Sequence, residues 1–297
     1  MDEKNSKLAY SIAFFVAMLW GTSAAVSKLV LTNLSFWNVQ LYTLAFTSVF
    51  LFVVILFQKK TSLLKSISIQ DLFWMAFIGF LGKFLYGNLF YIAIGRLPTQ
   101  EAFIINYLWP LMVVISASFI LKEKLTVFKY ISLILSFFAV ILVATKGDFN
   151  NIQLADNFGV LCAFLGAISY GVYSSLSKKR NFDPLIGNFM FTLFGFILTA
   201  ISMPFFDKVE MISINQFYGL LWLGPILSLG AVMWLKALKI GDTSKVSNMI
   251  YFTPFFSLFY ISLLLGEQIT TASILGLFIL VFSNFVSLIN VGKKSSI

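Results

Sequence analysis

The sequence is dominated by ten apolar segments of about 20 residues, separated by short polar links. The hydrocarbon core of a bilayer is about 30 Å thick, a distance that a helix crosses in about 20 residues. Only 11% of the residues are charged, against about 25% in soluble domains. We therefore predict an all-α multi-pass membrane protein with ten transmembrane helices. The segments are Leu8–Leu31, Phe36–Phe57, Leu72–Ile94, Ala102–Leu121, Val127–Ala144, Phe158–Leu176, Leu185–Phe206, Phe217–Leu238, Val246–Leu265 and Thr271–Val291.

The distribution of basic residues predicts the orientation of these helices. Sixteen of the 21 Lys and Arg residues lie at the two ends of the chain, or in or directly beside the links that follow an even-numbered segment. The other links hold three, namely Arg96, Lys146 and Lys208. Because basic residues gather on the cytoplasmic side, we expect both termini in the cytoplasm and the protein in the cytoplasmic or inner membrane. The net charge of +9 then reflects topology, and we expect no nucleic-acid partner.

The residue types present argue against catalysis. There is no histidine, which removes imidazole from any metal site or nucleophilic triad. The single cysteine, Cys162, lies in an apolar segment, and no Asp or Glu lies near the middle of a segment. We expect no enzyme, no catalytic residue, no metal and no cofactor. An intramembrane lipid-modifying enzyme is the alternative of another class, but it would need paired acids, a metal cluster or an activated nucleophile.

The two halves of the chain repeat each other. Pro110 and Glu123 are matched 144 residues later by Pro254 and Glu267. Trp20-Gly21 is echoed by Tyr170-Gly171, 150 residues later. Five helices are an odd number, so the two copies should be inverted in the membrane. We predict repeats over residues 1–145 and 158–297, joined by an extracytoplasmic linker over 146–157; inverted repeats are typical of alternating-access transporters with a midplane site.

Lys83 is the leading candidate for that site, because it lies at the middle of the third segment. A cation at this depth is costly and usually marks a functional position. No carboxylate at the same depth could neutralise it, so a substrate carboxylate or phosphate is the expected partner. The alternative is a lysine bound to backbone carbonyls or extended toward the interface. Tyr86, Gly87 and Phe90 should share its helix face.

Other polar and aromatic residues are expected at similar depth. Pro110 and Pro254 should break their helices, freeing backbone groups that only protein or a wet cavity can satisfy. Asn side chains beside them can also act as contacts between helices, and the aromatic residues as core packing. The predicted substrate-binding residues are Lys83, Tyr86, Asn106, Trp109, Trp20, Tyr170, Tyr173, Trp234, Asn248 and Tyr251.

Charged residues near the segment ends have expected structural roles. Lys28 should anchor its helix at the interface. Glu123 and Glu267 should cap helices or pair with neighbouring loops. Glu101 lies at the start of a helix, where the helix dipole favours a carboxylate.

The motifs resemble those of the ten-helix drug/metabolite transporter superfamily, EamA type. They are Leu19-Trp20-Gly21 with Lys28, Pro110 with Leu121-Lys122-Glu123, and Pro254 with Leu265-Gly266-Glu267. Asn106-Tyr107-Leu108-Trp109-Pro110 is similar to the aromatic amino acid exporter branch, which implies efflux of Phe, Tyr, Trp and related compounds. Lys122 departs from the Gly-Glu pair usual at that position.

The leading hypothesis is a secondary transporter or facilitator that exports small metabolites, most favourably amino acids with aromatic or apolar side chains, through a central cavity. The partners would be the small-molecule substrate and the lipid bilayer, and the protein could be a monomer or a homodimer. An uptake or exchange carrier for a phosphorylated or nucleotide-like metabolite is the alternative, with Lys83 as the phosphate partner.

Overall fold

The computed structural model describes residues 3–122, 127–145, 147–148, 156–180, 182–230 and 252–288, together with 233, 237 and 249. Throughout these residues the regular structure is helical and contains no strand. Six helical segments are long and apolar enough to cross a membrane, and three shorter apolar helices accompany them. The eighth and ninth predicted segments are described only in part, so the count of ten helices remains a prediction.

The helices follow the predicted segments closely where both can be compared. Predicted and observed ends coincide for α3 and α9, and α10 and α11 begin one residue before their predicted starts. The elements are α1 (Glu3–Gly21), α2 (Ser23–Leu31), α3 (Phe36–Phe57), α4 (Thr61–Lys65), α5 (Ile69–Gly79), η1 (Phe80–Leu85), α6 (Tyr86–Arg96), α7 (Thr99–Asn106), α8 (Trp109–Ile120), α9 (Val127–Ala144), α10 (Asn157–Arg180), α11 (Pro184–Phe206), α12 (Ile214–Leu221), η2 (Trp222–Ile226), α15 (Thr253–Leu265) and α16 (Thr271–Leu288).

Side-chain caps set several helix ends. The Ser35 hydroxyl accepts a hydrogen bond from the backbone N–H of Asn38 at the start of α3. Asp183 accepts bonds from Leu185 and Ile186 at the start of α11. At a C-terminal helix end, Gly266 follows the last residue of α15 with φ of 67°, a left-handed conformation that favours glycine. Such caps satisfy backbone groups that a helix end leaves open.

Several of the predicted membrane segments are interrupted. The first is interrupted at Thr22, between α1 and α2. In the fourth, α7 ends at Asn106 and α8 begins at Trp109, with Pro110 in the first turn of α8; α15 likewise begins with Pro254 in its first turn. The third was expected to be an unbroken α-helix, but its centre is the π-helical segment η1. A second π-helical segment, η2, follows α12.

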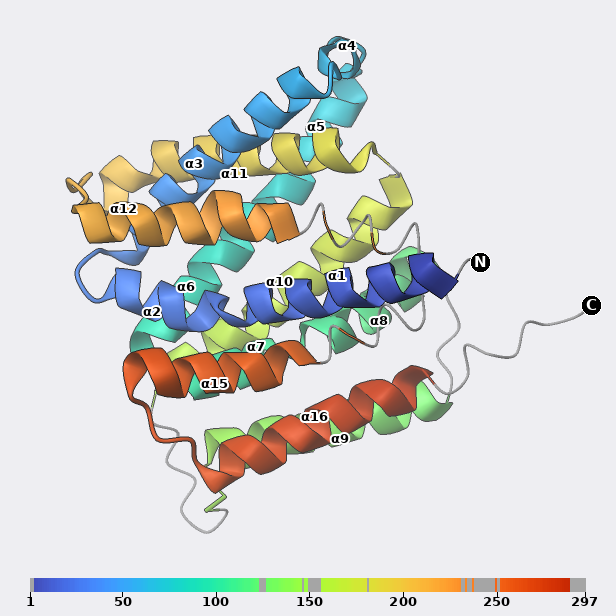
Figure 1. Ribbon diagram of the computed structural model, residues 1–297, viewed down its shortest axis with the longest axis vertical. Coiled ribbons are helices and arrows are strands. Elements are labelled where there is room, and N and C mark those ends of the chain that lie inside the picture. Colours follow the sequence, from blue (N-terminus) through green and yellow to red (C-terminus); the bar gives the residue numbers. More distant parts are fainter. Residues whose placement is uncertain are drawn as a thin grey trace, which may run out of the picture.

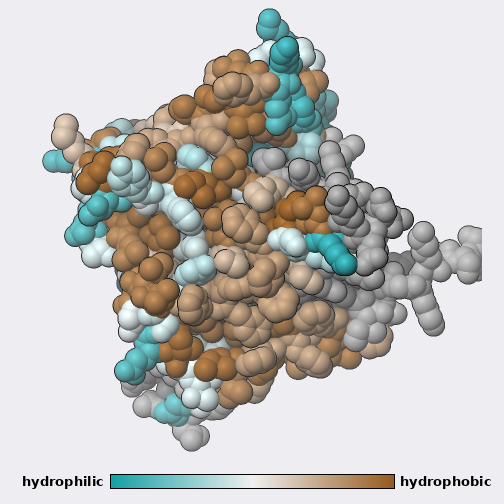
Figure 2. Space-filling view, in the orientation of Figure 1, coloured by the Kyte–Doolittle hydropathy of each residue, from teal (hydrophilic) through white to brown (hydrophobic). Residues whose placement is uncertain are grey.

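The helices run back and forth across the bundle, and the main packed pairs include both antiparallel and parallel neighbours (Figure 1). α16 packs antiparallel to α9 and α3 antiparallel to α11, whereas α8 packs parallel to α10 and α15 parallel to α1 (Figure 1). The start of α1 and the end of α16 lie at the same end of the bundle (Figure 1). Figure 2 shows apolar side chains across the middle of the surface and hydrophilic ones toward the helix ends, as a bilayer requires.

Two glycines bring helices of different halves into close contact. A Cβ on Gly21 of α1 would lie 2.7 Å from the Cβ of Phe256 on α15. A Cβ on Gly171 of α10 would lie 2.7 Å from the Cβ of Met112 on α8. Real Cβ atoms do not approach this closely, so only glycine permits either helix pair its observed separation.

Candidate functional site

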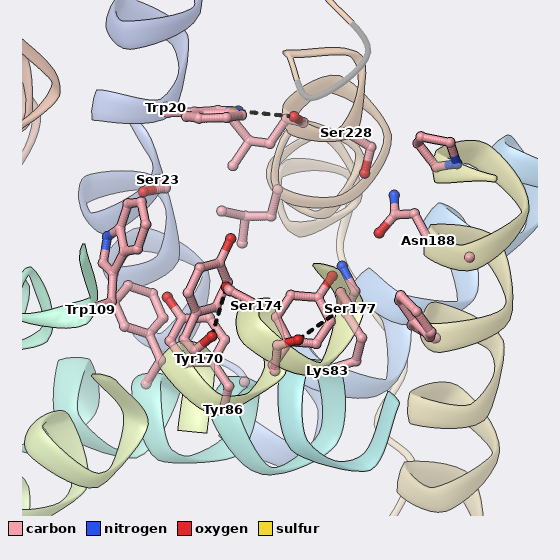
Figure 3. A pocket seen from close by; sticks show the side chains of 18 of the residues that line it. Trp20, Ser23, Lys83, Tyr86, Trp109, Tyr170, Ser174, Ser177, Asn188 and Ser228 are labelled. Carbon is pink, nitrogen blue, oxygen red and sulfur yellow. Dashed lines mark hydrogen bonds between the residues drawn. The ribbon is translucent and has the colours of Figure 1, made fainter. Parts of the chain in front are cut away.

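A cavity of about 1120 Å³ lies between the helices. Its wall is built from the junction of α1 and α2, the C-terminal part of α3, η1 and α6, the break between α7 and α8, α10, the start of α11, and η2. Figure 3 shows serine, aromatic and amide side chains that point into it from opposite sides, with Trp20 and Ser228 facing Lys83 across the space.

Lys83 enters this cavity from η1. Its Nζ lies 5.9 Å from the centroid of the Tyr173 ring, over the ring face. A cation over an aromatic face is attracted by the ring quadrupole. Within the part of the chain that the structure describes, Nζ has no carboxylate within ion-pair distance. Nor does Lys83 Nζ donate a hydrogen bond to a backbone carbonyl of these residues, whereas Lys28 Nζ does so to Ile94.

Aromatic rings form a continuous wall beside Lys83. The centroid of Tyr170 lies 4.9 Å from that of Tyr86, 5.1 Å from that of Trp109 and 5.4 Å from that of Tyr173. These distances lie in the range preferred by packed aromatic pairs. On the facing side, the indole N–H of Trp20 donates to the carbonyl of Leu227, 3.2 Å away (Figure 3). The wall therefore offers ring faces and edges, with phenol groups among them.

The predicted substrate-binding residues divide into two groups. Those that the structure describes all line the cavity: Lys83, Tyr86, Asn106, Trp109, Trp20, Tyr170 and Tyr173. The Asn106 amide donates to the Tyr86 hydroxyl, 3.3 Å away, so a hydrogen bond links these two side chains. Trp234, Asn248 and Tyr251 lie outside the described residues. Whether any of them binds substrate remains a prediction.

The sequence interpretation missed most of the small polar groups in the wall. Ser23, Ser27, Ser174, Ser177 and Asn188 line the cavity, as do Ser228 and Thr253. A signal was available for the serines on α2 and α10. Ser23 and Ser27 are four residues apart, and Ser174 and Ser177 follow Tyr170 and Tyr173 at four-residue spacing, which places them on neighbouring positions of one helix face.

One end of the cavity reaches the C-terminal end of α3 and the N-terminal end of α11. Lys60 Nζ pairs with Asp183 Oδ2 at 2.8 Å, and both residues line this mouth. Partial burial favours the neutral acid at Asp183. The hydrogen bonds from Lys60, Ile186 and Leu185 outweigh it and hold the pKa of Asp183 below its usual value. The mouth therefore carries a fixed ion pair at neutral pH.

The opposite end of the bundle is held together by polar contacts. Lys28 Nζ donates to the carbonyl of Ile94 at 2.7 Å, at the end of α6, which places this predicted interface anchor on a helix terminus. Glu267 accepts hydrogen bonds from the backbone N–H groups of Thr99 and Gln100 and so caps α7. This confirms the predicted capping role of Glu267, whereas Glu123 lies outside the described residues.

An ion pair and a packed core complete the closure at this end. Arg96 Nε lies 2.8 Å from Asp156 Oδ2. The hydrogen bond from the backbone N–H of Gly159, and after it the pairing with Arg96, lowers the pKa of Asp156. Nearby, Ile94 and Leu97 are buried and belong to the largest apolar cluster, to which the cavity-lining Phe103 and Tyr107 also belong.

Comparison with known proteins identifies the family. The model of the EamA-like transporter family matches residues 7–145 and again residues 157–289. The chain belongs to the EamA-like transporter family. As an EamA-like protein with several long apolar helices, it is a multi-pass membrane protein and a membrane transporter.

Relatives of this EamA-like protein are also described as transporters. The uncharacterized transporter YoaV of Bacillus subtilis (strain 168) is 25% identical over 94% of this chain and 96% of its own length. The uncharacterized inner membrane transporter YhbE of Escherichia coli (strain K12) is 24% identical over 85% and 80%. A solved crystal structure shares the fold, with a TM-score of 0.65, 18% identity and coverage of 96% of this chain and 99% of the other.

Proposed function

We propose that this EamA-like protein exports small metabolites, most favourably amino acids with aromatic or apolar side chains, by alternating access through the central cavity. The observation that carries this proposal is the environment of Lys83. Its ammonium group points into a cavity whose adjoining wall is aromatic. A substrate with one anionic group and one apolar body matches both features.

The chemistry of recognition follows from the wall. The substrate carboxylate would accept hydrogen bonds from Lys83 Nζ and replace water there, a charge-assisted interaction. The aromatic side chain would pack against Tyr170 and Trp109, where ring pairs favour offset or edge-to-face contacts. Sites for small molecules typically enclose about 300–1,000 Å³, so the cavity of about 1120 Å³ has room for an amino acid with some water.

The glycine contacts support the inverted repeat that alternating access requires. Gly171 lies 150 residues after Gly21, and Phe256 lies 144 residues after Met112, which are the two offsets of the sequence repeat. The contact of Gly21 with Phe256 is thus the repeat mate of the contact of Gly171 with Met112. The two separate matches to the family model, over residues 7–145 and 157–289, support the same division.

The position of the mouth supports loading from the cytoplasm. The cavity reaches the end of α3, which is the side that the basic residues predict to be cytoplasmic. At the other end, Lys28, Glu267 and the Arg96–Asp156 pair hold the helices together. Export would follow when this closed end opens and the mouth closes.

A substrate panel in proteoliposomes tests the proposal. The purified full-length protein is reconstituted, and transport of labelled phenylalanine, leucine, alanine, serine and a sugar phosphate is measured with and without a pH gradient. We expect phenylalanine and leucine to be carried best. Transport of the sugar phosphate alone would replace the proposal with the phosphorylated-metabolite alternative, and transport of none of them would remove it.

A further inference from the structure

The π-helical segment η1 is held by polar side chains from the helices around it. Gln40 of α3 donates from Nε2 to the carbonyl oxygen of Lys83, 2.5 Å away. Ser169 of α10 donates to the carbonyl of Leu81 at 2.8 Å. Asn88 of α6 donates to the carbonyl of Phe84, also at 2.8 Å. All three donors are more than nine-tenths buried.

These bonds have a specific use in a membrane helix. A π-helical turn widens the helix by one residue and is rarely stable without support. Inside a bilayer, a carbonyl that has lost its regular partner needs another donor, because no water is available outside a cavity. Gln40 donates from α3 to the carbonyl of Lys83 itself. Ser169 donates from α10 to the carbonyl of Leu81, which also accepts the π-helical bond from the backbone N–H of Tyr86.

A third helix fixes Lys83 by shape. Gly195 of α11 faces it so closely that a Cβ on Gly195 would lie 2.6 Å from the Cβ of Lys83. The base of the lysine side chain is thus confined by α11, while its backbone is held by α3 and the preceding turn by α10. If η1 returned to a regular α-helix, its turn would hold one residue fewer. The helix on one side of η1 would then rotate by about 100° relative to the helix on the other side.

We infer that Gln40 and Ser169 are positioning residues: they stabilise the π-helical turn and thereby aim the Lys83 side chain into the cavity. The inference deepens the proposed function, since it assigns the groups that set the orientation of the proposed carboxylate partner. It predicts that loss of either donor moves position 83 out of the cavity while the bundle stays folded.

The test measures the position of residue 83 without measuring transport. Lys83→Cys is made in a Cys162→Ala background, and the full-length protein in detergent reacts with a charged methanethiosulfonate reagent. We expect Gln40→Leu and Ser169→Ala each to slow the modification about tenfold, the factor that corresponds to loss of one well-formed buried hydrogen bond. Ser169→Ala is the gentler change and keeps the test readable if Gln40→Leu fails to fold.

Each variant has a matched control on its own helix. Thr47→Val removes a buried hydroxyl of α3 that donates to the carbonyl of Thr43. Ser175→Ala removes a buried hydroxyl of α10 that donates to the carbonyl of Val113 on α8. Neither donates to η1, so both should leave the modification rate unchanged. Equal rates in all four variants, or slowing in the controls as well, would overturn the inference.

A second readout separates positioning from general damage. When transport of phenylalanine into proteoliposomes is measured, Ser169→Ala should raise the KM for phenylalanine with little change in the maximal transport rate. The same substitution in a Lys83→Met background should have no further effect on KM, whereas additive effects would contradict a role that acts through Lys83. If the wild type carries no substrate, the proposed function fails, but the modification rates still decide the inference about η1.

Discussion

Replacement of Lys83 by methionine is the most informative single substitution. Methionine keeps the length and apolar stem of lysine and removes only the ammonium group. Among the described residues, that ammonium group has no carboxylate partner, and its one aromatic contact is with Tyr173. Its removal therefore breaks no ion pair within them, and we expect the folded protein to retain or gain thermal stability, because an ammonium group inside a membrane is costly.

The loss should appear in substrate affinity. A hydrogen bond to a charged group contributes about 1.5–3 kcal/mol net. Since about 1.4 kcal/mol corresponds to a factor of ten, the KM for phenylalanine should rise by about 10- to 150-fold. At substrate concentrations near the wild-type KM, transport by Lys83→Met should be close to abolished. Lys83→Arg keeps the charge and serves as the control, with a smaller loss.

The assay is concentration-dependent uptake of labelled phenylalanine into proteoliposomes, with melting temperatures measured on the same preparations. A wild-type KM in the Lys83→Met variant would refute the role of Lys83 as the carboxylate partner. A melting temperature lowered by more than about 5 °C would point instead to a structural role, because a shift of that size corresponds to more than about 1 kcal/mol.

Three further predictions concern the wall, the helix contacts and the mouth. Trp109→Ala should impair transport of phenylalanine and tryptophan more than that of alanine or serine in a substrate panel, and equal impairment would count against an aromatic subsite. Gly171→Ala should lower the melting temperature, because overpacking a close helix contact costs about 1–3 kcal/mol; Gly95→Ala, where an added Cβ meets no atom within 4 Å, should raise it slightly. Asp183→Ala should lower stability more than Lys60→Met. Both remove an ion pair whose side chains are about one-third exposed, but only Asp183→Ala also removes a helix cap worth about 1 kcal/mol. The lowered pKa of Asp183 makes its contribution complete at neutral pH and lost only as the pH falls through that pKa, so the difference in melting temperature between wild type and Asp183→Ala should be the same at pH 6 and pH 8.

Sequence patterns predicted the helices well because membrane helices obey a length constraint. An apolar segment must be about as long as the bilayer is thick, and few other structures satisfy backbone hydrogen bonds in lipid. The predicted bounds of Phe36–Phe57 therefore match those of α3. The cap at Ser35 could also have been anticipated, since a serine before an apolar segment is a common start of a helix.

The π-helical segment could not be predicted in the same way. Phe80–Leu85 has no residue that disfavours a regular α-helix apart from Gly82. The donors that support the wider turn come from Gln40 and Ser169, 43 and 88 residues away from the carbonyls that they bind. A feature that depends on such distant contacts leaves no local pattern in the sequence.

The candidate site could be predicted only in part. The sequence indicates how deep a residue lies in the membrane, but not which way its side chain points. Lys83 and Tyr170 were predicted because their depth in a membrane segment is unusual for their type, and Tyr86 because it follows Lys83 at helical spacing. Asn188 was not, because a single amide in an apolar segment also suits a contact between helices. Helical spacing alone could not tell which face of α11 meets the cavity, since that depends on how α11 packs against α3.

The most direct test of alternating access is the reaction of Lys83→Cys, in a Cys162→Ala background, with a membrane-impermeant thiol reagent applied to right-side-out and to inverted membrane vesicles. If a water-filled site is opened in turn to the two sides, position 83 reacts from both. A position that reacts from neither side, or from one side only, would contradict the account.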